Sequence, residues 1–217
     1  MDNFSDLHQK DEQQTVKLNP FTSVWLHPKK TARYMIDVKS IGYVILILSI
    51  SNIGVLLSNV MEIGLPVWLI ILLCIFLAPI AGLFGSAIFT CATWLFGKLF
   101  KGTATFSELF KALSLTAIPY IALIPFYLIW LYVSPESLLI ADYIGPTPWI
   151  FWLTTLATII ISIWSFVITV AAVAEAHQIS NWKAFFTVFI PSILLVVFIT
   201  IIVVLFMIIT LISIGML

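Results

Sequence analysis

The sequence is poor in charged residues. Only 9% of its 217 residues are Asp, Glu, Lys or Arg, whereas ordinary soluble domains contain about 25%. Hydrophobic residues make up 62% of the chain, so there are too few polar side chains to cover a soluble fold of this size. This composition excludes an ordinary water-soluble domain. It predicts an all-α protein, a polytopic helix bundle whose solvent is lipid.

The motifs of catalysis and cofactor binding are also missing. The sequence contains no Gly-rich phosphate loop, zinc motif or nucleophile elbow. His8, His27 and His177 are scattered, and Glu175 lies two positions before His177, so on a helix the two side chains would point to different faces. Charges inside the apolar runs, which mark ion pumps, are nearly absent. We therefore predict no catalytic, metal or cofactor site, no enzyme activity and no nucleic-acid partner.

Cysteine is scarce, and no signal-peptide pattern precedes the first apolar run. Cys74 and Cys91 lie in one apolar segment, where a continuous helix would separate them by about 25 Å. A disulfide needs Cα atoms within about 7 Å, so we expect two free, buried cysteines. Residues 1–19 are polar and mixed in charge, which predicts a disordered cytoplasmic tail.

Five apolar runs are long enough to cross a bilayer. The predicted spans are about 41–60, 67–97, 113–133, 148–174 and 184–214. The second run is either one long helix or two short ones that turn near Pro79 and Gly82. Two helices would each reach only about 23 Å, too short to cross, and would put Lys98, Lys101 and Lys111 outside. Five spans place all ten Lys and Arg residues on one side, so residues 41–217 are predicted to form five transmembrane helices, with the N-terminus inside and the C-terminus outside.

Residues 20–40 form a cationic segment before the first span. Pro28 suits the first position of a helix. One side of that helix carries Lys29, Lys30, Arg33 and Asp37, of which Arg33 and Asp37 are four apart and can pair. The other side carries Ala32, Met35, Ile36 and Val38. We predict an amphipathic helix in the inner membrane interface, with membrane-surface contacts from Lys29, Lys30, Arg33 and Trp25. The alternative is a solvated basic loop without a membrane role.

Small residues follow one side of the second span. Ala78, Gly82, Ser86 and Thr90 recur every four residues, and Gly85 lies beside them. Small residues at this spacing let a second helix approach closely in lipid. We therefore predict helix packing at Ala78, Gly82, Gly85 and Ser86, against a helix of the same chain or of another. In the first span, Asn52 is expected to face the bundle.

A polar stripe follows one face of the fourth span. It consists of Thr154, Thr158, Ser162, Ser165 and Thr169, with Ala172 after it. Such hydroxyls either bond to helix backbones and neighbouring helices or line a path for a solute. Both interpretations stay open from the sequence. Glu175, at the inner end of the stripe, is expected to be hydrated.

The inner segment 96–120 carries clear helix signals. Gly102 suits a helix stop. Thr105 and Glu108 form a T-x-x-E capping box that starts the next helix. That helix is expected to bend at Pro119 and Pro125.

Three stretches resemble bacterial members of the Yip (Ypt-interacting protein) domain family. They are NPFTSVWLHPKKTARYMID (19–37), KGTATFSELFKALSLTAIP (101–119) and AEAHQISNWKAFFTVFIP (174–191). The positions that carry the match include Pro20, Pro28, Gly102, Glu108, Pro119 and Pro191. The chain departs from the bacterial pattern at Lys101, Ala104 and Leu115, and it lacks the acidic Leu-Tyr-Gly-Pro motif of eukaryotic relatives. The resemblance implies a five-span protein with a cytosolic N-terminus that organises membrane proteins or traffic, with some relatives beside export systems.

Two functions follow from these observations. The first is a non-enzymatic adapter or accessory factor for partner membrane proteins in a bacterial cytoplasmic membrane. Its partner would be an ABC-type exporter linked to envelope stress or antimicrobial-peptide tolerance. The second is a lipid or small-solute transporter that uses the polar stripe. The expected partners are the lipid bilayer and other integral membrane proteins, and a homo-oligomer fits the same pattern.

Overall fold

The structure is a computed structural model that describes residues 18–57, 66–140 and 142–213. Within these ranges all regular elements are helices, which confirms the predicted all-α class. In chain order they are α2 (Pro20–Ser23), α3 (Pro28–Val38), α4 (Ile41–Leu57), α5 (Val67–Leu99), α6 (Phe106–Leu113), the 3-10 helix η1 (Ser114–Ala117), α7 (Ile118–Ile121), α8 (Ile124–Val133), α9 (Pro135–Leu139), α10 (Trp149–His177) and α11 (Asn181–Ser213).

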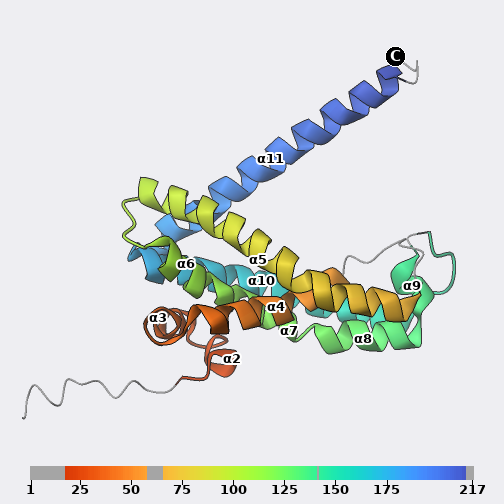
Figure 1. Cartoon of the computed structure of the whole chain (residues 1–217), viewed down its shortest axis with the longest axis horizontal. Coiled ribbons are helices and arrows are strands. Elements are labelled where there is room, and N and C mark those ends of the chain that lie inside the picture. Colours follow the sequence, from red (N-terminus) through yellow and green to blue (C-terminus); the bar gives the residue numbers. More distant parts are fainter. Residues whose placement is uncertain (1–17, 58–65, 141, 214–217) are drawn as a thin grey trace, which may run out of the picture.

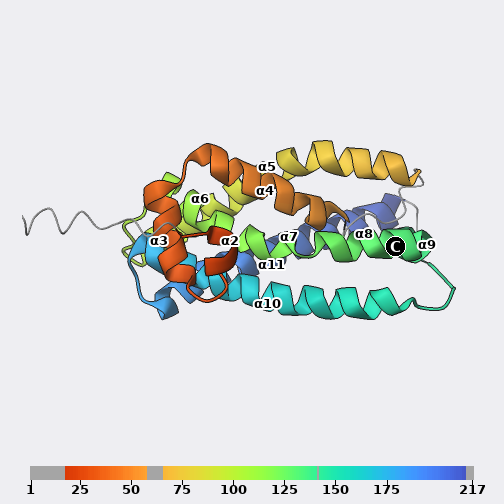
Figure 2. The ribbon, with the colours of Figure 1, turned by 90° about the horizontal axis from the view of Figure 1, so that it is seen from below.

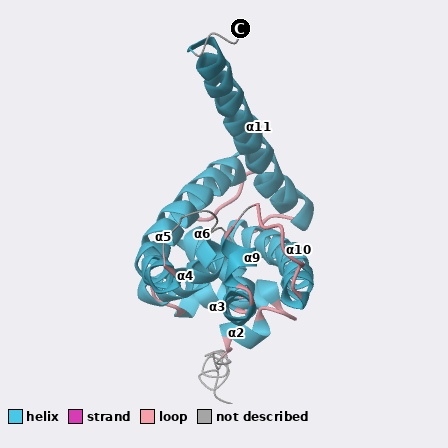
Figure 3. Ribbon diagram, turned by 90° about the vertical axis from the view of Figure 1, so that its right-hand side faces the viewer, coloured by secondary structure: helices cyan, strands magenta, loops and turns pink. Residues whose placement is uncertain are grey.

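The body is a bundle of helices that run back and forth along one axis. Helices α4, α5 and α10 and the run α7–α8 lie along the long axis of the molecule (Figures 1 and 2). Helix α4 packs against α5 and α7, and α10 packs against α8. Helix α11 touches α5 and α10 near its start and then projects away from the body, as Figure 3 shows from the side. The last helix is therefore set apart from the bundle.

Proline and capping residues explain where several helices begin. Helix α3 starts at Pro28, as predicted, and α2 starts at Pro20 after Asn19, whose side chain accepts a hydrogen bond from Phe21 N. The capping box of Thr105 and Glu108 is confirmed at the start of α6. Pro119 and Pro125 stand in the first turns of α7 and α8. These prolines break the run 106–133 into successive short helices, because a proline has no N–H to donate within a helix and fits most readily in the first turn.

The ambiguous second apolar run is one helix. Helix α5 extends from Val67 to Leu99 with Pro79 inside it. Cys74 and Cys91 are both free, as expected, but only Cys74 is buried. The prediction that Cys91 is buried is wrong, because Cys91 lies on an exposed face of α5.

Four stretches of the described chain are long and apolar enough to cross a membrane. They are Trp68–Leu99, Phe106–Val133, Trp149–His177 and Asn181–Thr210. Helix α4 has 17 residues, or about 26 Å, which falls short of a hydrocarbon core of about 30 Å. The predicted first span, 41–60, ends in residues that lie outside the described ranges. The chain is thus a multi-pass membrane protein with four such helices, and a fifth span and the orientation of the termini stay predictions.

Basic residues gather at one end of the bundle, here called the basic end. This end holds α3, α6, the last turn of α5, the end of α10 and the start of α11 (Figure 1). All eight Lys and Arg residues of the described ranges lie there. They are Lys29, Lys30, Arg33, Lys39, Lys98, Lys101, Lys111 and Lys183. Helix α9 lies at the opposite end. The one-sided charge distribution that the topology prediction uses is therefore also a feature of the fold.

The buried core has two parts. The larger part lies at the basic end, where α3, α4, α6, η1 and α10 meet around residues such as Met35, Ile47, Leu109 and Ile168. The smaller part lies at the opposite end around α8 and α9 and includes Trp130. The core at the basic end includes the apolar face of α3, so this face packs against protein.

Candidate functional site

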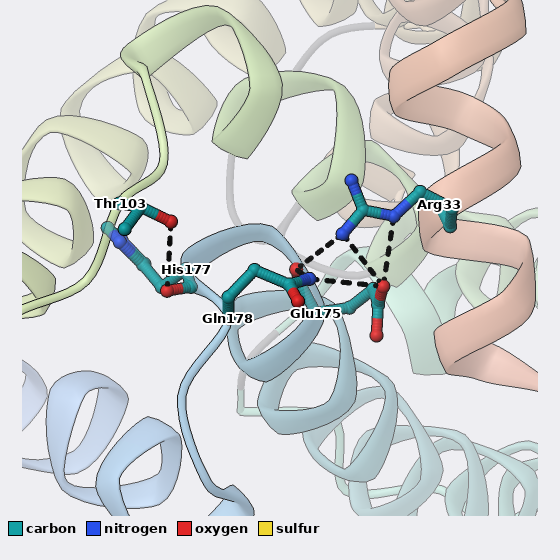
Figure 4. Close-up of polar contacts among 5 residues, drawn as sticks. All are labelled: Arg33, Thr103, Glu175, His177 and Gln178. Atoms are coloured by element: carbon teal, nitrogen blue, oxygen red, sulfur yellow. Dashed lines mark hydrogen bonds and ion pairs between the residues drawn. The ribbon is translucent and has the colours of Figure 1, made fainter.

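An ion pair joins the N-terminal segment to α10 at the basic end. Arg33 of α3 places Nη2 2.9 Å and Nε 3.0 Å from Oε1 of Glu175. The same Nη2 donates to the backbone carbonyl of Glu175 at 3.3 Å. Gln178 donates to the carbonyl and carboxylate of the same residue from the other side, as Figure 4 shows. Glu175 therefore accepts hydrogen bonds from two side chains, Arg33 of α3 and Gln178 directly after α10.

This pair corrects two predictions. Arg33 pairs with Glu175, and no ion pair joins it to Asp37 among the described residues. Glu175 is not simply hydrated, since 24% of its side chain is exposed and its carboxylate is engaged. The reason is tertiary: α3 packs across α10, which brings together two residues that are 142 positions apart.

A second polar contact holds the C-terminal end of α3. Lys111 of α6 donates from Nζ to the backbone carbonyl of Ile36 at 3.0 Å. A cation at the last carbonyls of a helix satisfies an acceptor that has no partner within the helix. Helix α3 is thus held to α10 by an arginine on its own surface and to α6 by a lysine on its neighbour.

His177 is an enclosed polar side chain of this region. It is the last residue of α10 and is completely buried. Neither ring nitrogen has a hydrogen-bond partner. The ring lies between Gly97 of α5 and Gly102 of the following loop, so closely that a Cβ at either glycine would collide with it. Its backbone carbonyl accepts from Thr103 N at 3.1 Å and from Thr103 Oγ1 at 3.3 Å (Figure 4). The imidazole therefore fills a slot made by two glycines.

Gly102 takes part in the stop of α5 but is not its left-handed residue. The residue in the left-handed region after α5 is Lys101, with φ 63°. Gly102 follows it and donates its N–H to the carbonyl of Gly97 at 2.9 Å, which closes the last turn. The absence of a side chain at position 102 makes room for the His177 ring. The sequence gives no local signal for this, because the contact spans 75 positions.

The family-motif positions lie mostly at helix starts and at contacts between helices. Pro20 and Pro28 begin α2 and α3, and Glu108 completes the capping box of α6. Gly102 faces His177, and Pro119 begins α7. Pro191 lies inside α11 and lines a groove against α5.

The small-residue positions of α5 divide between two neighbours. Ala78 and Gly82 are buried, and Gly82 lies against the side chain of Asn52, which donates to Leu48 O at 2.8 Å. Asn52 thus faces the bundle, as expected. Ser86 is half-buried, whereas Gly85 is exposed and has open space around it. Gly85 instead lines the groove between α5 and α11.

The polar stripe of α10 does not line one continuous surface. Ser165 donates to Thr116 O at 2.8 Å and Thr169 to Ser165 O at 2.8 Å, and both are buried. Thr154 and Thr158 lie toward the opposite end, where they line a hollow of about 420 Å³. The hydroxyl of Thr154 is buried there without a partner. Ser162, between the two parts, is exposed.

The residues predicted to contact the membrane surface have different neighbours. Lys29 and Lys30 are exposed on α3, and Arg33 is drawn into the ion pair. Trp25 packs against the core at the basic end and donates from Nε1 to Phe21 O at 2.9 Å. Because Ala32, Met35 and Ile36 are buried in the protein, the membrane contact of this helix stays a prediction for its lysine side only.

The geometry at the basic end holds helices together. No group of three His, Cys, Asp or Glu residues that could hold a metal occurs in the described ranges. The ion pair, the lysine tie and the glycine slot all join segments that are far apart in the sequence. The arrangement is that of a joint between the N-terminal segment, the α5–α6 loop and the end of α10.

Comparison with protein families gives a match over most of the chain. The model of the Yip1 domain matches residues 22–205, a range that contains α3, the α5–α6 loop, α10 and the joint between them. No curated protein and no solved structure matches the chain.

Proposed function

This chain belongs to the Yip1 domain family, and from that premise we propose that it is a non-enzymatic adapter for partner membrane proteins. It would act as an accessory or assembly factor within the bilayer. Three observations support the proposal: the family membership, the apolar helices, and a surface suited to a partner helix.

That surface is the groove between α5 and α11, and it is the observation that carries the proposal. The groove encloses about 760 Å³ and is lined by apolar and small residues, among them Gly85, Ala92 and Ser192. In lipid, helices associate through close packing at small residues rather than through the hydrophobic effect. Gly85 has no atom of another element near its Cβ position. A transmembrane helix of a partner protein can therefore approach the backbone of α5 here.

Helix α11 extends this surface. In the apolar window of α11 no residue is buried within the chain. A helix that packs on its own bundle along its whole length would have one buried face. The freely projecting half of α11 supports a contact with a second protein, and a second copy of the chain is one such protein.

The partner that we propose is an ABC-type exporter in a bacterial cytoplasmic membrane, linked to envelope stress or antimicrobial-peptide tolerance. The support is the resemblance of three stretches of the chain to bacterial relatives, some of which occur beside export systems. The absence of a catalytic pattern in the sequence favours an accessory role over a chemical one.

Purification from native cells in gentle detergent tests the adapter. Gly85→Leu fills the groove, whereas Cys91→Leu adds bulk to an exposed face of α5 that lies about 120° away and outside the groove. Exporter subunits should co-purify with the wild type and with Cys91→Leu, and Gly85→Leu should lose them. Recovery of no membrane partner, or equal recovery with Gly85→Leu, would argue against the adapter.

The hollow lined by Thr154 and Thr158 supports the second function, movement of a lipid or small solute. The buried hydroxyl of Thr154 without a partner is the observation in its favour. Against it, Ser165 and Thr169 are bonded to backbone carbonyls, so the stripe does not continue as an open path. Purified protein in liposomes should scramble a labelled lipid or leak a solute if this function holds. If the protein is only an adapter, lipid scrambling and solute leakage should occur at the rates of protein-free liposomes.

A further inference from the structure

A crevice at the basic end has two kinds of wall. It encloses about 610 Å³ between the start of α3, the inner half of α10 and the start of α11. One wall carries His27, Lys29 and Lys30. The opposite wall is apolar and includes Phe166, Val170 and Phe185. The charged part and the apolar part of the crevice are thus separated in space.

The charged wall is suited to an anion. Lys29 and Lys30 are exposed, and none of the residues lining the crevice is acidic. The first hydrogen bond of α3 runs from Thr31 N to His27 O at 3.0 Å, so the N–H groups of Lys29 and Lys30 have no partner within the helix. The side chain of His27 provides no cap. The neighbouring carboxylate, Glu175, is already paired with Arg33. Lys29 and Lys30, together with the first N–H groups of α3, therefore line the same opening.

The apolar wall is continuous with the lipid-facing surface. Phe166 and Val167 belong to a candidate membrane-crossing helix and remain partly exposed. Phe185 stands in the first turns of α11, another such helix. This wall therefore belongs to two helices that are long and apolar enough to cross a bilayer, while the lysines of α3 lie at the basic end.

We propose that this crevice is a binding site for an anionic phospholipid of the surrounding leaflet. The phosphate accepts hydrogen bonds from Lys29 and Lys30, and an acyl chain lies along Phe166, Val170 and Phe185. A free phosphate would use only the charged wall, and a neutral phospholipid would leave the lysines without a net counter-charge. Only an anionic amphiphile satisfies both walls. The site does not depend on the adapter function.

The first experiment titrates phosphatidylglycerol and phosphatidylcholine into the full-length protein and measures bound lipid by native mass spectrometry. The wild type should retain phosphatidylglycerol preferentially. The double change Lys29→Gln and Lys30→Gln should weaken that binding about 30-fold, the effect of two basic residues at an anionic surface, and leave phosphatidylcholine unchanged. The matched control removes the same charge from the same end with Lys98→Gln and Lys101→Gln, and should keep the preference.

A second pair of variants tests the apolar wall. Ala171→Trp places a large ring in the crevice, whereas Ser162→Trp places it on an exposed face of the same helix, on average about 110° from the crevice residues. Ala171→Trp should lose the retained phosphatidylglycerol, and Ser162→Trp should keep it. Both proteins should show the thermal unfolding of the wild type, which separates a blocked site from a misfolded chain.

Three outcomes would overturn the proposal. Equal retention of the two lipids by the wild type would show that no anionic site exists. An equal loss with the Lys98 and Lys101 variant would show a diffuse charge effect at the basic end. Displacement of phosphatidylglycerol by soluble glycerol phosphate at similar concentration would show that the ligand is a free phosphate and that the apolar wall takes no part.

Discussion

The glycine slot around His177 gives a sharp prediction within a single helix. Gly97 and Gly85 both belong to α5, but a Cβ at Gly97 collides with the buried imidazole, whereas a Cβ at Gly85 meets nothing. Alanine in a helix interior is favoured over glycine by about 0.5–1 kcal/mol. Gly85→Ala should therefore keep or raise the free energy of unfolding. Gly97→Ala should lower it by about 1–3 kcal/mol, the usual effect of overpacking a filled site.

The collision at Gly97 cannot be relieved by a small rotation of the ring. Gly102 also borders the imidazole, so closely that a Cβ at Gly102 would collide with the ring. The backbone of that loop is fixed by the bonds of Gly102 N to Gly97 O and of Thr103 N to His177 O. A ring displaced from one glycine therefore meets the other.

The assay is reversible unfolding in mixed detergent micelles, with a double-mutant cycle. His177→Ala removes the ring, so Gly97→Ala should hardly lower the free energy of unfolding when both changes are combined. A coupling free energy of about 1–3 kcal/mol between the two positions is expected. Equal stability of Gly97→Ala and Gly85→Ala would refute the slot, and so would an equal cost of Gly97→Ala with and without the imidazole.

Two further predictions concern the ion pair and the topology. Arg33→Glu should lower the free energy of unfolding by about 1 kcal/mol or less, because 41% of the Arg33 side chain is exposed. Adding Glu175→Arg to the same molecule should restore most of this loss. No recovery in the doubly changed protein would contradict the pairing. In a variant without the native cysteines, a cysteine at Ser137 should react with an impermeant thiol reagent on intact cells, and a cysteine at Ser107 should not. The reason is that the basic end is predicted to face the cytoplasm. Labelling of position 107 from outside would contradict the predicted five-span topology.

Local signals in the sequence predict the helices well. The capping box of Thr105 and Glu108 and the prolines at 28, 119 and 125 act within one turn, so each fixes a helix start wherever the helix lies. The single helix through Pro79 follows from the length of its apolar run. These features depend on neighbours a few residues away, and a sequence shows such neighbours directly.

The joint at the basic end could not be predicted in the same way. Arg33 has an acidic residue four positions away, yet the packing of α3 on α10 offers it Glu175 instead. The pattern of α3 correctly gives an apolar side, but the pattern is the same whether protein or lipid covers it. The exposure of Cys91 and the divided course of the polar stripe likewise depend on which helix lies opposite. A single sequence does not contain that information.

The ion pair between α3 and α10 also has a consequence in time. Arg33 and Glu175 are separated by 142 residues, so at synthesis rates of about 5–20 residues per second the arginine waits roughly 7–28 s for its partner. During that interval α10 does not yet cover the apolar face of α3, and an amphipathic helix with such a face lies at a bilayer surface. The nascent chain would keep this segment at the membrane until α6 and then α10 pack against it.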